Sequence, residues 1–268
     1  MRLSAFAAVI CCLIFTGSAA AATPAGKAVG VNPSAQDVVA NSTRTLVVGS
    51  DVAMGDKIVT GANGQVQLVF NDQTHLVVGP SSALVIESYL LRNDKSVSQF
   101  TLDALGGSYR FITGQSDHSV YTIKTPTGTI GVRGTAFDWT TAKPGTTGQA
   151  RSAASTPGTF LPGTVVALFR GAVILCDLQK KCVTLNSKCD AGMIETDKAQ
   201  TIGRFDAADM QLRSRFIYIQ SQKPLLEPFQ INEARLCFIQ PGGSNSGLSI
   251  TMSSPTATST PSRCGFDC

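Results

Sequence analysis

Apolar and polar residues alternate along short stretches of the first two thirds of the chain. Over residues 65–70 the apolar residues Val66, Leu68 and Phe70 fall on one face and two glutamines on the other, which is the period of two of a half-buried strand. Four further stretches of this kind are bounded by Gly, Asn, Asp or Ser, namely Ala83–Leu91, Gln99–Leu105, Tyr109–Thr113 and Val120–Lys124. The pattern predicts about eight to ten short strands.

The turn signals between these stretches are evenly spaced. Gly55-Asp56, Asn63-Gly64, Asn71-Asp72 and Gly79-Pro80 follow one another at intervals of eight residues. Even spacing of short strands is typical of a sandwich, a barrel or a solenoid, and turns that recur at constant length favour a solenoid. We therefore expect an all-β fold, solenoid-like or a sandwich, with a small helix-containing extension at its C-terminal end.

The N-terminal residues 1–22 have the pattern of a secretory signal peptide. Arg2 precedes an apolar run from Ala5 to Phe15, and a stretch of small residues follows it. The run is too short to cross a bilayer, and no later segment approaches the apolar length of a membrane helix. We expect a periplasmic or secreted protein with no transmembrane segment after cleavage.

The rest of the chain divides into a β domain and less regular flanks. Residues 23–42 are small, polar and Pro-containing, which predicts a flexible lead-in to a β domain over residues 43–196. Inside that domain, residues 142–163 are rich in Thr, Pro, Gly and Ser, and a stretch of this length and composition is interpreted as a flexible insert.

The C-terminal part is predicted to hold one helix and a tail. Residues 197–240 form the extension, in which apolar residues recur at helical spacing between Arg204 and Ile219, so one amphipathic helix is expected there. Residues 241–268 are rich in Ser, Thr, Gly and Pro, and such a low-complexity segment cannot bury enough apolar surface to stay ordered.

Six cysteines follow the predicted signal peptide, and all lie in the C-terminal part of the chain. An even number in an exported protein indicates disulfides, and six cysteines allow fifteen pairings. A zinc site is disfavoured because the spacings lack close pairs such as C-x-x-C with histidine support. We expect the pairs Cys176–Cys182, Cys189–Cys237 and Cys264–Cys268, the last closing a small loop in the tail.

Charge and motifs disfavour several classes of function, namely nucleic-acid binding, motif-based catalysis and metal or nucleotide binding. Without Arg2 the chain keeps 21 basic and 18 acidic residues, and because these form no dense basic cluster we expect no nucleic-acid partner. Motifs of a nucleophile elbow, a zinc protease helix, an EF-hand or a Walker loop do not occur. His75 and His118 are interpreted as exposed histidines of loops or strand edges. We expect no catalytic residue, no cofactor and no metal.

Two groups of residues resemble the ends of a FecR domain. The first comprises Gly55, Asp56, Thr60, Gly61, Gly64, Gly79 and Pro80, and the second Thr125, Pro126, Val132, Arg133, Gly134, Thr135 and Phe137. The similarity extends over roughly Thr43 to Met193. Gln73 stands where the family usually has Gly, which suggests a different turn geometry, and Val165–Leu175 resembles a closing hairpin turned at Arg170-Gly171.

The resemblance implies a domain of the bacterial envelope that senses or binds and is not an enzyme. Its expected partner is an envelope protein or a cell-wall or polysaccharide ligand. Control of a sigma factor does not carry over, because a sigma regulator of this type has a transmembrane helix before its periplasmic domain. An alternative function is that of an enzyme acting on envelope polysaccharide or peptidoglycan without a recognisable motif.

Three residues are candidate ligand or partner contacts. Arg133 lies on an apolar strand, so it is either half-buried and hydrogen-bonded, which we favour, or it projects toward an anion or a glycan. Tyr109 and Trp139 could form a platform on which a sugar stacks, although lone aromatic residues more often belong to the core. The glycines, prolines and threonines of the two motif groups are interpreted as structural.

Overall fold

The computed structural model describes residues 23–39, 42–92, 96–142, 163–205 and 210–237. Most of these residues form strands that belong to one continuous mixed sheet. The strands are β1 (Pro24–Asn32), β2 (Ala35–Val39), β3 (Ser42–Leu46), β4 (Asp51–Ala53), β5 (Lys57–Thr60), β6 (Gln65–Phe70), β7 (His75–Val78), β8 (Ala83–Leu91), β9 (Val97–Ile112), β10 (Tyr121–Thr125), β11 (Gly128–Thr141), β12 (Thr164–Asp177), β13 (Cys182–Leu185), β14 (Asp190–Ile194) and β15 (Ala199–Arg204). The predicted all-β class is confirmed.

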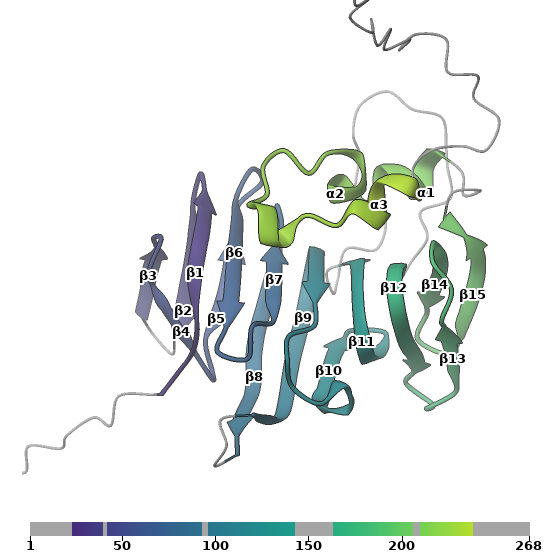
Figure 1. Cartoon of the computed structure of the whole chain (residues 1–268), viewed down its shortest axis with the longest axis horizontal. Coiled ribbons are helices and arrows are strands. Elements are labelled where there is room, and N and C mark those ends of the chain that lie inside the picture. Colours follow the sequence, from purple (N-terminus) through teal and green to yellow (C-terminus); the bar gives the residue numbers. More distant parts are fainter. Residues whose placement is uncertain (1–22, 40–41, 93–95, 143–162, 206–209, 238–268) are drawn as a thin grey trace, which may run out of the picture.

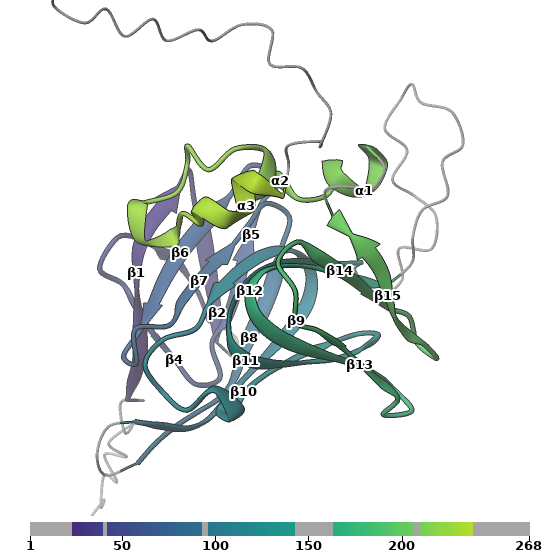
Figure 2. The same cartoon turned by 45° about the vertical axis from the view of Figure 1, so that its right-hand side comes forward.

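The helices are short, and most of them follow the last strand. They are α1 (Met210–Ser214), α2 (Ile217–Gln220) and α3 (Asn232–Leu236), with the 3₁₀ turns η1 (His118–Val120) and η3 (Glu227–Phe229). Residues 210–237, called the cover below, run over one side of the sheet (Figure 1, Figure 2).

The sheet folds over so that two leaves face each other. Leaf A has the order β4-β1-β6-β7-β9-β11-β12-β14-β15, and leaf B has the order β3-β2-β5-β8-β9-β10-β11-β12-β13. The long strands β9, β11 and β12 belong to both leaves, one half to each. All pairings are antiparallel except that of β9 with β10. Of the two architectures that the sequence left open, this one is a sandwich.

Glycines mark the places where the long strands pass from one leaf to the other. Gly171 in β12 has a φ of 77°, and a Cβ there would lie 2.0 Å from the carbonyl oxygen of Gly134 in β11. The register of β11 against β12 shifts at the same level, between Arg133 and Ala136. The predicted hairpin turn at Arg170-Gly171 is therefore wrong, because Gly171 forms a bulge within one continuous strand.

One apolar core fills the space between the leaves. It combines inward residues of leaf A, such as Leu68 and Phe111, with residues of leaf B, such as Leu84 and Ile123. Phe100 packs against Phe111 and three other aromatic rings and lies among apolar side chains of both leaves. Burial of side chains this large stabilises the fold by about 1.5–3 kcal/mol for each one that is fully enclosed.

The predicted strands are largely present with their predicted limits. β6 and β8 have the predicted bounds, and the predicted stretches Gln99–Leu105 and Tyr109–Thr113 join into the single strand β9. They join because Gly106 and Gly107, both at positive φ, bend the strand without reversing it. A Cβ on Gly107 would lie 2.1 Å from the side chain of Ser82.

The predicted limits of the β domain are too narrow at both ends. The lead-in over residues 23–42 is not flexible throughout, because β1 lies between β6 and β4, and β2 pairs with β3 and β5. Small residues in β1 permit this close packing, since a Cβ on Gly26 would lie 2.5 Å from the carbonyl oxygen of Val69. At the other end, β15 extends leaf A beyond residue 196.

The single amphipathic helix predicted between Arg204 and Ile219 is also wrong. The chain there forms α1 and α2, separated at Phe216, whose backbone leaves the helical region with φ −104° and ψ 82°. This break lets Phe216 bury its ring edge-on against Phe205 while Tyr218 and Ile219 turn toward leaf A. Tertiary packing therefore outweighs the local helical pattern.

Two of the expected disulfides are present. Cys176–Cys182 joins β12 to β13, and Cys189–Cys237 ties the end of the cover to the chain between β13 and β14. The expected pair Cys264–Cys268, the signal peptide, residues 143–162 of the insert and the tail lie outside the described residues. Among the residues that are described, no helix has the length and apolarity to cross a membrane.

The turn after β6 holds Gln73 in the conformation usual for Gly. Gln73 has a φ of 64°, so the turn geometry that glycine favours is kept although the residue has changed. The expectation of a different turn at this position is wrong. A side chain in this region costs roughly 1 kcal/mol relative to Gly because of contact between Cβ and backbone.

Replacement of Gln73 by Gly should therefore stabilise the protein slightly. We expect the free energy of unfolding to rise by up to about 1 kcal/mol, the strain relieved being partly offset by the greater freedom of Gly in the unfolded chain. Urea unfolding of the two proteins measures this difference. A loss of stability would show that the Gln73 side chain makes a favourable contact that outweighs its strain.

Candidate functional site

The outward face of leaf A is polar at its centre and lies beneath the cover. Gln65 and Gln67 on β6 were predicted on the polar face of the strand, and they do point away from the core between the leaves. They are nonetheless buried, with 6% and 3% of their surface exposed, because the cover lies on them. The outward face of leaf A is therefore an internal interface.

A buried ion pair joins two neighbouring strands on this face. The Nε and Nη2 atoms of Arg110 on β9 donate to the two carboxylate oxygens of Asp138 on β11, at 2.7 and 2.9 Å. The two residues are directly opposite each other in the strand register. Burial raises the pKa of Asp138, and the guanidinium of Arg110 opposes that effect.

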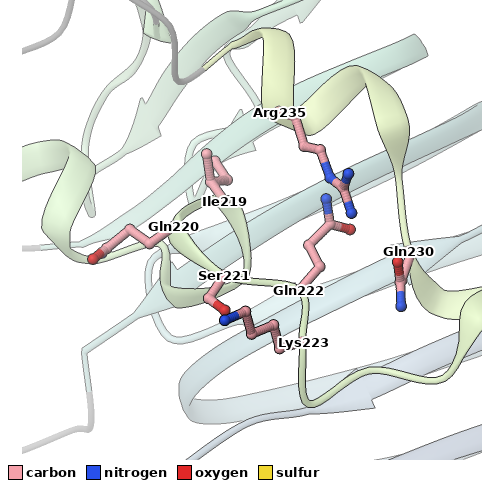
Figure 3. Close-up of a pocket in the computed structure, with 7 residues that line it drawn as sticks. All are labelled: Ile219, Gln220, Ser221, Gln222, Lys223, Gln230 and Arg235. Carbon is pink, nitrogen blue, oxygen red and sulfur yellow. The ribbon is translucent and has the colours of Figure 1, made fainter. Parts of the chain in front are cut away.

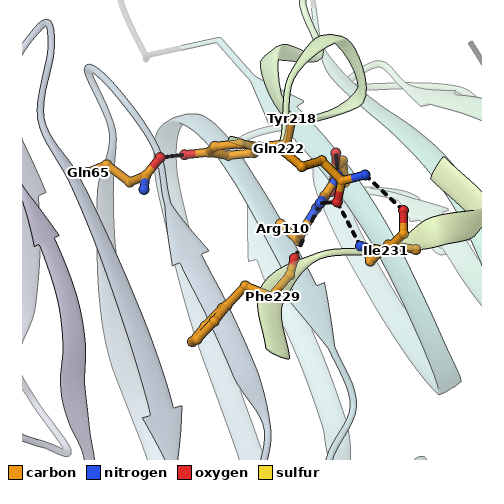
Figure 4. A network of polar contacts seen from close by, with 7 residues as sticks. Gln65, Arg110, Tyr218, Gln222, Phe229 and Ile231 are labelled. Carbon is orange, nitrogen blue, oxygen red and sulfur yellow. Dashed lines mark hydrogen bonds and ion pairs between the residues drawn. The ribbon is translucent and has the colours of Figure 1, made fainter. Parts of the chain in front are cut away.

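The cover completes the coordination of Arg110. Nη1 donates to Oε1 of Gln222 at 2.6 Å and to the carbonyl oxygen of Phe229 at 3.3 Å (Figure 4). The guanidinium carbon lies 5.5 Å from the ring centre of Tyr218 and 5.6 Å from that of Phe169, distances typical of cation–π contacts. The charge on Arg110 is thus enclosed by sheet and cover together.

The two glutamines of β6 form hydrogen bonds with the middle of the cover. The hydroxyl of Tyr218 donates to Oε1 of Gln65 at 2.9 Å, and the backbone N–H of Leu226 donates to Oε1 of Gln67 at 2.8 Å. Both amide nitrogens lie 3.3 Å from the carbonyl oxygen of Pro224. Burial raises the pKa of Tyr218, which keeps its hydroxyl protonated as the donor.

A polar pocket lies within the cover above this network. It has a volume of about 470 Å³ and is lined by three amides, two cations, one hydroxyl and one aliphatic side chain, namely Gln220, Gln222, Gln230, Lys223, Arg235, Ser221 and Ile219 (Figure 3). Its size is within the range of small-molecule sites. Gln222 belongs both to the pocket and to the buried network, so it connects the two.

Hydrogen bonds fix the three amides of the pocket. Gln222 accepts from the backbone N–H of Ile231 at 2.6 Å and donates to its carbonyl oxygen at 2.9 Å. Gln220 donates to the carbonyl oxygen of Ser214 at 3.0 Å, and Gln230 donates to that of Leu225 at 2.9 Å. The amides are therefore held in place, as a preorganised binding site requires.

Several residues singled out from the sequence form the turns at the rim of the sandwich. Gly55 has a φ of 93°, and the next residue, Asp56, accepts from the backbone N–H of Ala53 at 2.8 Å. Thr60 donates to the carbonyl oxygen of Gly79 at 2.5 Å, and the carbonyl oxygen of Gly61 accepts from the N–H of Gly64. Pro80 follows directly in the turn between β7 and β8.

The second group of such residues organises the two ends of β11. Thr125 and Gly128 pair across the turn that Pro126 begins, and the hydroxyl of Thr125 donates to the carbonyl oxygen of Gly128 at 3.1 Å. At the bend, Gly134 has a φ of 60°, and the hydroxyl of Thr135 bonds to the carbonyl oxygen of Arg170. Both groups thus have structural roles in tight turns and bends.

Comparison with known proteins finds a family model that matches less than half of the chain. The family model described as FecR protein matches residues 56–173. The chain contains a FecR domain. The resemblance inferred from the motif residues is confirmed. The matched residues begin before β5 and end inside β12, so both leaves of the sandwich continue beyond them.

The solved structures that match include two of the same protein, whereas no protein with curated annotation matches. They are crystal structures of a candidate anti-sigma factor from Parabacteroides distasonis ATCC 8503. Each has 11% sequence identity and a TM-score of 0.40, and each match covers 55% of this chain and 58% of the other. This chain therefore corresponds to little more than half of each of those structures.

Two of the three candidate contacts lie in the core of the sandwich. Tyr109 and Trp139 are stacked with their ring centres 4.6 Å apart, and each has at most 1% of its surface exposed. The hydroxyl of Tyr109 donates to the carbonyl oxygens of Gly106 and Ala83 at 2.6 and 2.7 Å. They cannot form a platform for a sugar, because they occupy the inward face of leaf A.

Arg133, the third candidate, has the opposite environment to the one favoured from the sequence. It is exposed next to the bend in β11. Within the described ranges its side chain makes no hydrogen bond or ion pair, so the half-buried structural role is wrong. The buried arginine of the FecR domain is Arg110. Arg133 stays a candidate contact, but it lies outside the residues that line the pocket.

A signal for the buried ion pair is present in the sequence. Tyr109-Arg110-Phe111 and Phe137-Asp138-Trp139 each place one charged residue between two large aromatic residues. In a strand the aromatic residues face one side and the charge the other. Opposite charges in the same setting on two strands therefore suggest a pair on the outward face. The pocket has no comparable signal, because its lining comes from a segment without regular periodicity.

Three aspartates of the sandwich form hydrogen bonds or ion pairs that stabilise turns and strands. Asp56 caps its turn, and its carboxylate lies 3.5 Å from the guanidinium of Arg44, which also binds Asp37. Asp72 accepts from the hydroxyl of Tyr121 at 2.7 Å. Among the described residues, no three His, Cys, Asp or Glu side chains gather where they could hold a metal ion.

His75 is half-buried and not exposed. It lies on β7, and its ring meets that of Phe229 in the cover edge-on at 4.9 Å. Burial lowers the pKa of His75 from its usual value of 6.5, and the nearby charge of Asp72 opposes that effect. The expectation of an exposed loop or strand-edge histidine is wrong because the cover reaches this strand.

The lowered pKa of His75 should make folding sensitive to acid. Above about pH 6.5 the residue is neutral in both states, but below it the unfolded chain binds the proton more readily, so stability falls with pH until His75 is also protonated in the folded protein. In His75→Gln this contribution disappears. Urea unfolding at about pH 7.5 and about pH 5 should show that the free energy of unfolding falls less with acid in the variant than in the unchanged protein. An equal fall in both would show that the lowered pKa of His75 is not the cause.

Proposed function

We propose that this protein is a non-enzymatic binding module of the bacterial cell envelope, acting as a sensor or a scaffold. Its place is the periplasm or the exterior of the cell, and its partner is an envelope protein or a cell-wall or polysaccharide ligand. The FecR domain supports this proposal at the level of the family. The predicted signal peptide agrees with it.

The observation that carries the proposal is the polar pocket of the cover. Its amides are fixed by hydrogen bonds to the backbone and, through Gln222, to an ion pair within the sheet. A concave site whose polar groups are already ordered loses little conformational entropy when a ligand binds. This arrangement is that of a recognition site built on a rigid scaffold.

The disulfides support a location outside the cytoplasm. Cys189–Cys237 and Cys176–Cys182 are of the kind that forms and persists in oxidising compartments. The first of them ties the cover to the FecR domain. The segment that forms the pocket is therefore attached to the sheet by a bond that exists only when these cysteines are oxidised.

Retention of envelope material by the purified protein tests the proposal. The chain from residue 23 onward is immobilised and incubated with three fractions from the source cells: detergent-solubilised envelope proteins, purified cell wall and extracellular polysaccharide. We expect saturable retention of a component from one fraction. Retention of none would contradict the proposal, and so would hydrolysis of cell wall or polysaccharide that is lost in His75→Gln or His118→Gln.

A further inference from the structure

We propose that the pocket of the cover binds an acidic saccharide, a sugar that carries a carboxylate or a phosphate group. This inference rests on the proposed binding function and makes its ligand specific. The hydrogen bonds that each lining side chain already makes show which of its polar groups can bind such a ligand.

The two cations of the pocket are available for an anion. Lys223 and Arg235 are exposed, and within the described ranges the side chain of neither makes a hydrogen bond or an ion pair. No carboxylate lines the pocket with them. Figure 3 shows the guanidinium of Arg235 reaching from α3 toward the amide of Gln222. An anionic group in the pocket would be held by charge-assisted hydrogen bonds, which are about twice as strong as neutral ones.

The amides present hydrogen-bond acceptors as well. Gln220 and Gln230 use their NH₂ groups on backbone carbonyl oxygens of the cover, which leaves their own carbonyl oxygens able to accept, that of Gln220 at the margin of the pocket (Figure 3). Gln222 spends Oε1 on Arg110 and Ile231 and one N–H on Ile231, and an amide has a second N–H to donate. Such a mixture of acceptors and donors matches the hydroxyl groups of a sugar.

Other ligand classes fit the lining less well. Single-stranded nucleic acid is bound by stacking of its bases on aromatic rings, whereas the pocket is lined by one aliphatic residue, Ile219, and otherwise by polar groups. Divalent cations are bound mainly by carboxylate oxygens, which the lining does not contain, and the charges of Lys223 and Arg235 would repel them. An apolar ligand would remove water from the two cations without giving them partners.

Calorimetric titration with defined sugars tests the inference. The probes are a trisaccharide of galacturonate, the neutral trisaccharide of galactose, and glucose 6-phosphate, at constant ionic strength. We expect at least one acidic probe to bind about tenfold or more tightly than the neutral one, since each charge-assisted contact is worth about a factor of ten. The two acidic probes distinguish a carboxylate from a phosphate as the group that is recognised.

Matched variants locate the site. Lys223→Gln and Arg235→Gln should each weaken binding of the acidic probe about tenfold or more without changing thermal stability, because both side chains are exposed. The control Lys198→Gln removes an exposed cation outside the pocket, and it should leave the affinity unchanged.

Three results would overturn the inference. They are equal binding of the neutral and acidic trisaccharides, an affinity that Lys198→Gln lowers as much as Arg235→Gln does, and binding of neither acidic probe. If neither probe binds while the immobilised protein still retains an envelope component, the ligand class is wrong and the binding function stands. If nothing is retained either, both proposals fail.

Discussion

Replacement of Asp138 by alanine should lower the free energy of unfolding by about 3–5 kcal/mol. The substitution leaves the guanidinium of Arg110 without a counter-ion in a place where neither residue is more than 2% exposed. A buried charge that loses its partner carries the full cost of its removal from water. Urea unfolding, monitored by the fluorescence of the single tryptophan at position 139, measures the change.

An exposed ion pair of the same sheet provides the control. Lys124 on β10 and Glu87 on β8 contact each other, with 48% and 42% of their side chains exposed. Lys124→Ala should cost less than about 1 kcal/mol, because exposed ion pairs contribute little. In the double variant Arg110→Met, Asp138→Leu, the loss should be smaller than in Asp138→Ala. A loss below about 1 kcal/mol for Asp138→Ala would show that water or another group compensates Arg110.

Removal of the disulfide between Cys189 and Cys237 should have a similar effect for a different reason. The bond closes a loop whose ends are separated by 48 residues, and the entropy of such a loop in the unfolded chain corresponds to about 4 kcal/mol. The variant with alanine at both positions should lose about this much stability. Hydrogen exchange should also become faster in residues 217–237 than in the strands of leaf B, because the end of the cover is released.

The second disulfide is the matched control. Cys176 and Cys182 are separated by 6 residues, so their removal should cost only about 2 kcal/mol and should leave exchange in the cover unchanged. The argument from loop entropy would be wrong if the two double variants lost equal stability. If hydrogen exchange rose equally over the whole protein, the disulfide Cys189–Cys237 would not act specifically on the cover.

The alternation of apolar and polar residues predicted most strands correctly. The strands that it did not predict form because of packing against residues that are distant in the sequence. β6 and β8 were predicted with their bounds because alternation and turn residues are local signals. β1 was missed since its Ala and Gly residues resemble a mobile segment in composition, although Gly26 is required where the backbone approaches Val69. A strand that depends on its neighbours for its conformation has no strong local signal.

The candidate site was the least predictable part. Alternation assigned Gln65 and Gln67 to the outward face of β6 correctly, but it cannot show that residues more than 150 positions later cover that face. For the same reason alternation leaves open whether Tyr109 and Trp139 face a ligand or the core, and the strands turn them inward, the alternative favoured from the sequence. Which outward face of a sandwich is free for a ligand depends on the whole chain.

The edges of the sheet bear on how a partner can be recognised. In the described part of the chain the leaves end at β3, β4, β13 and β15. β4 has 3 residues and β13 has 4, β3 exposes four polar side chains in succession, and the register of β15 is interrupted opposite Gly192. Short, polar or irregular edges resist the addition of a further strand. Association through backbone pairing, which leads both to peptide capture and to aggregation, is thus disfavoured, and recognition falls to side chains.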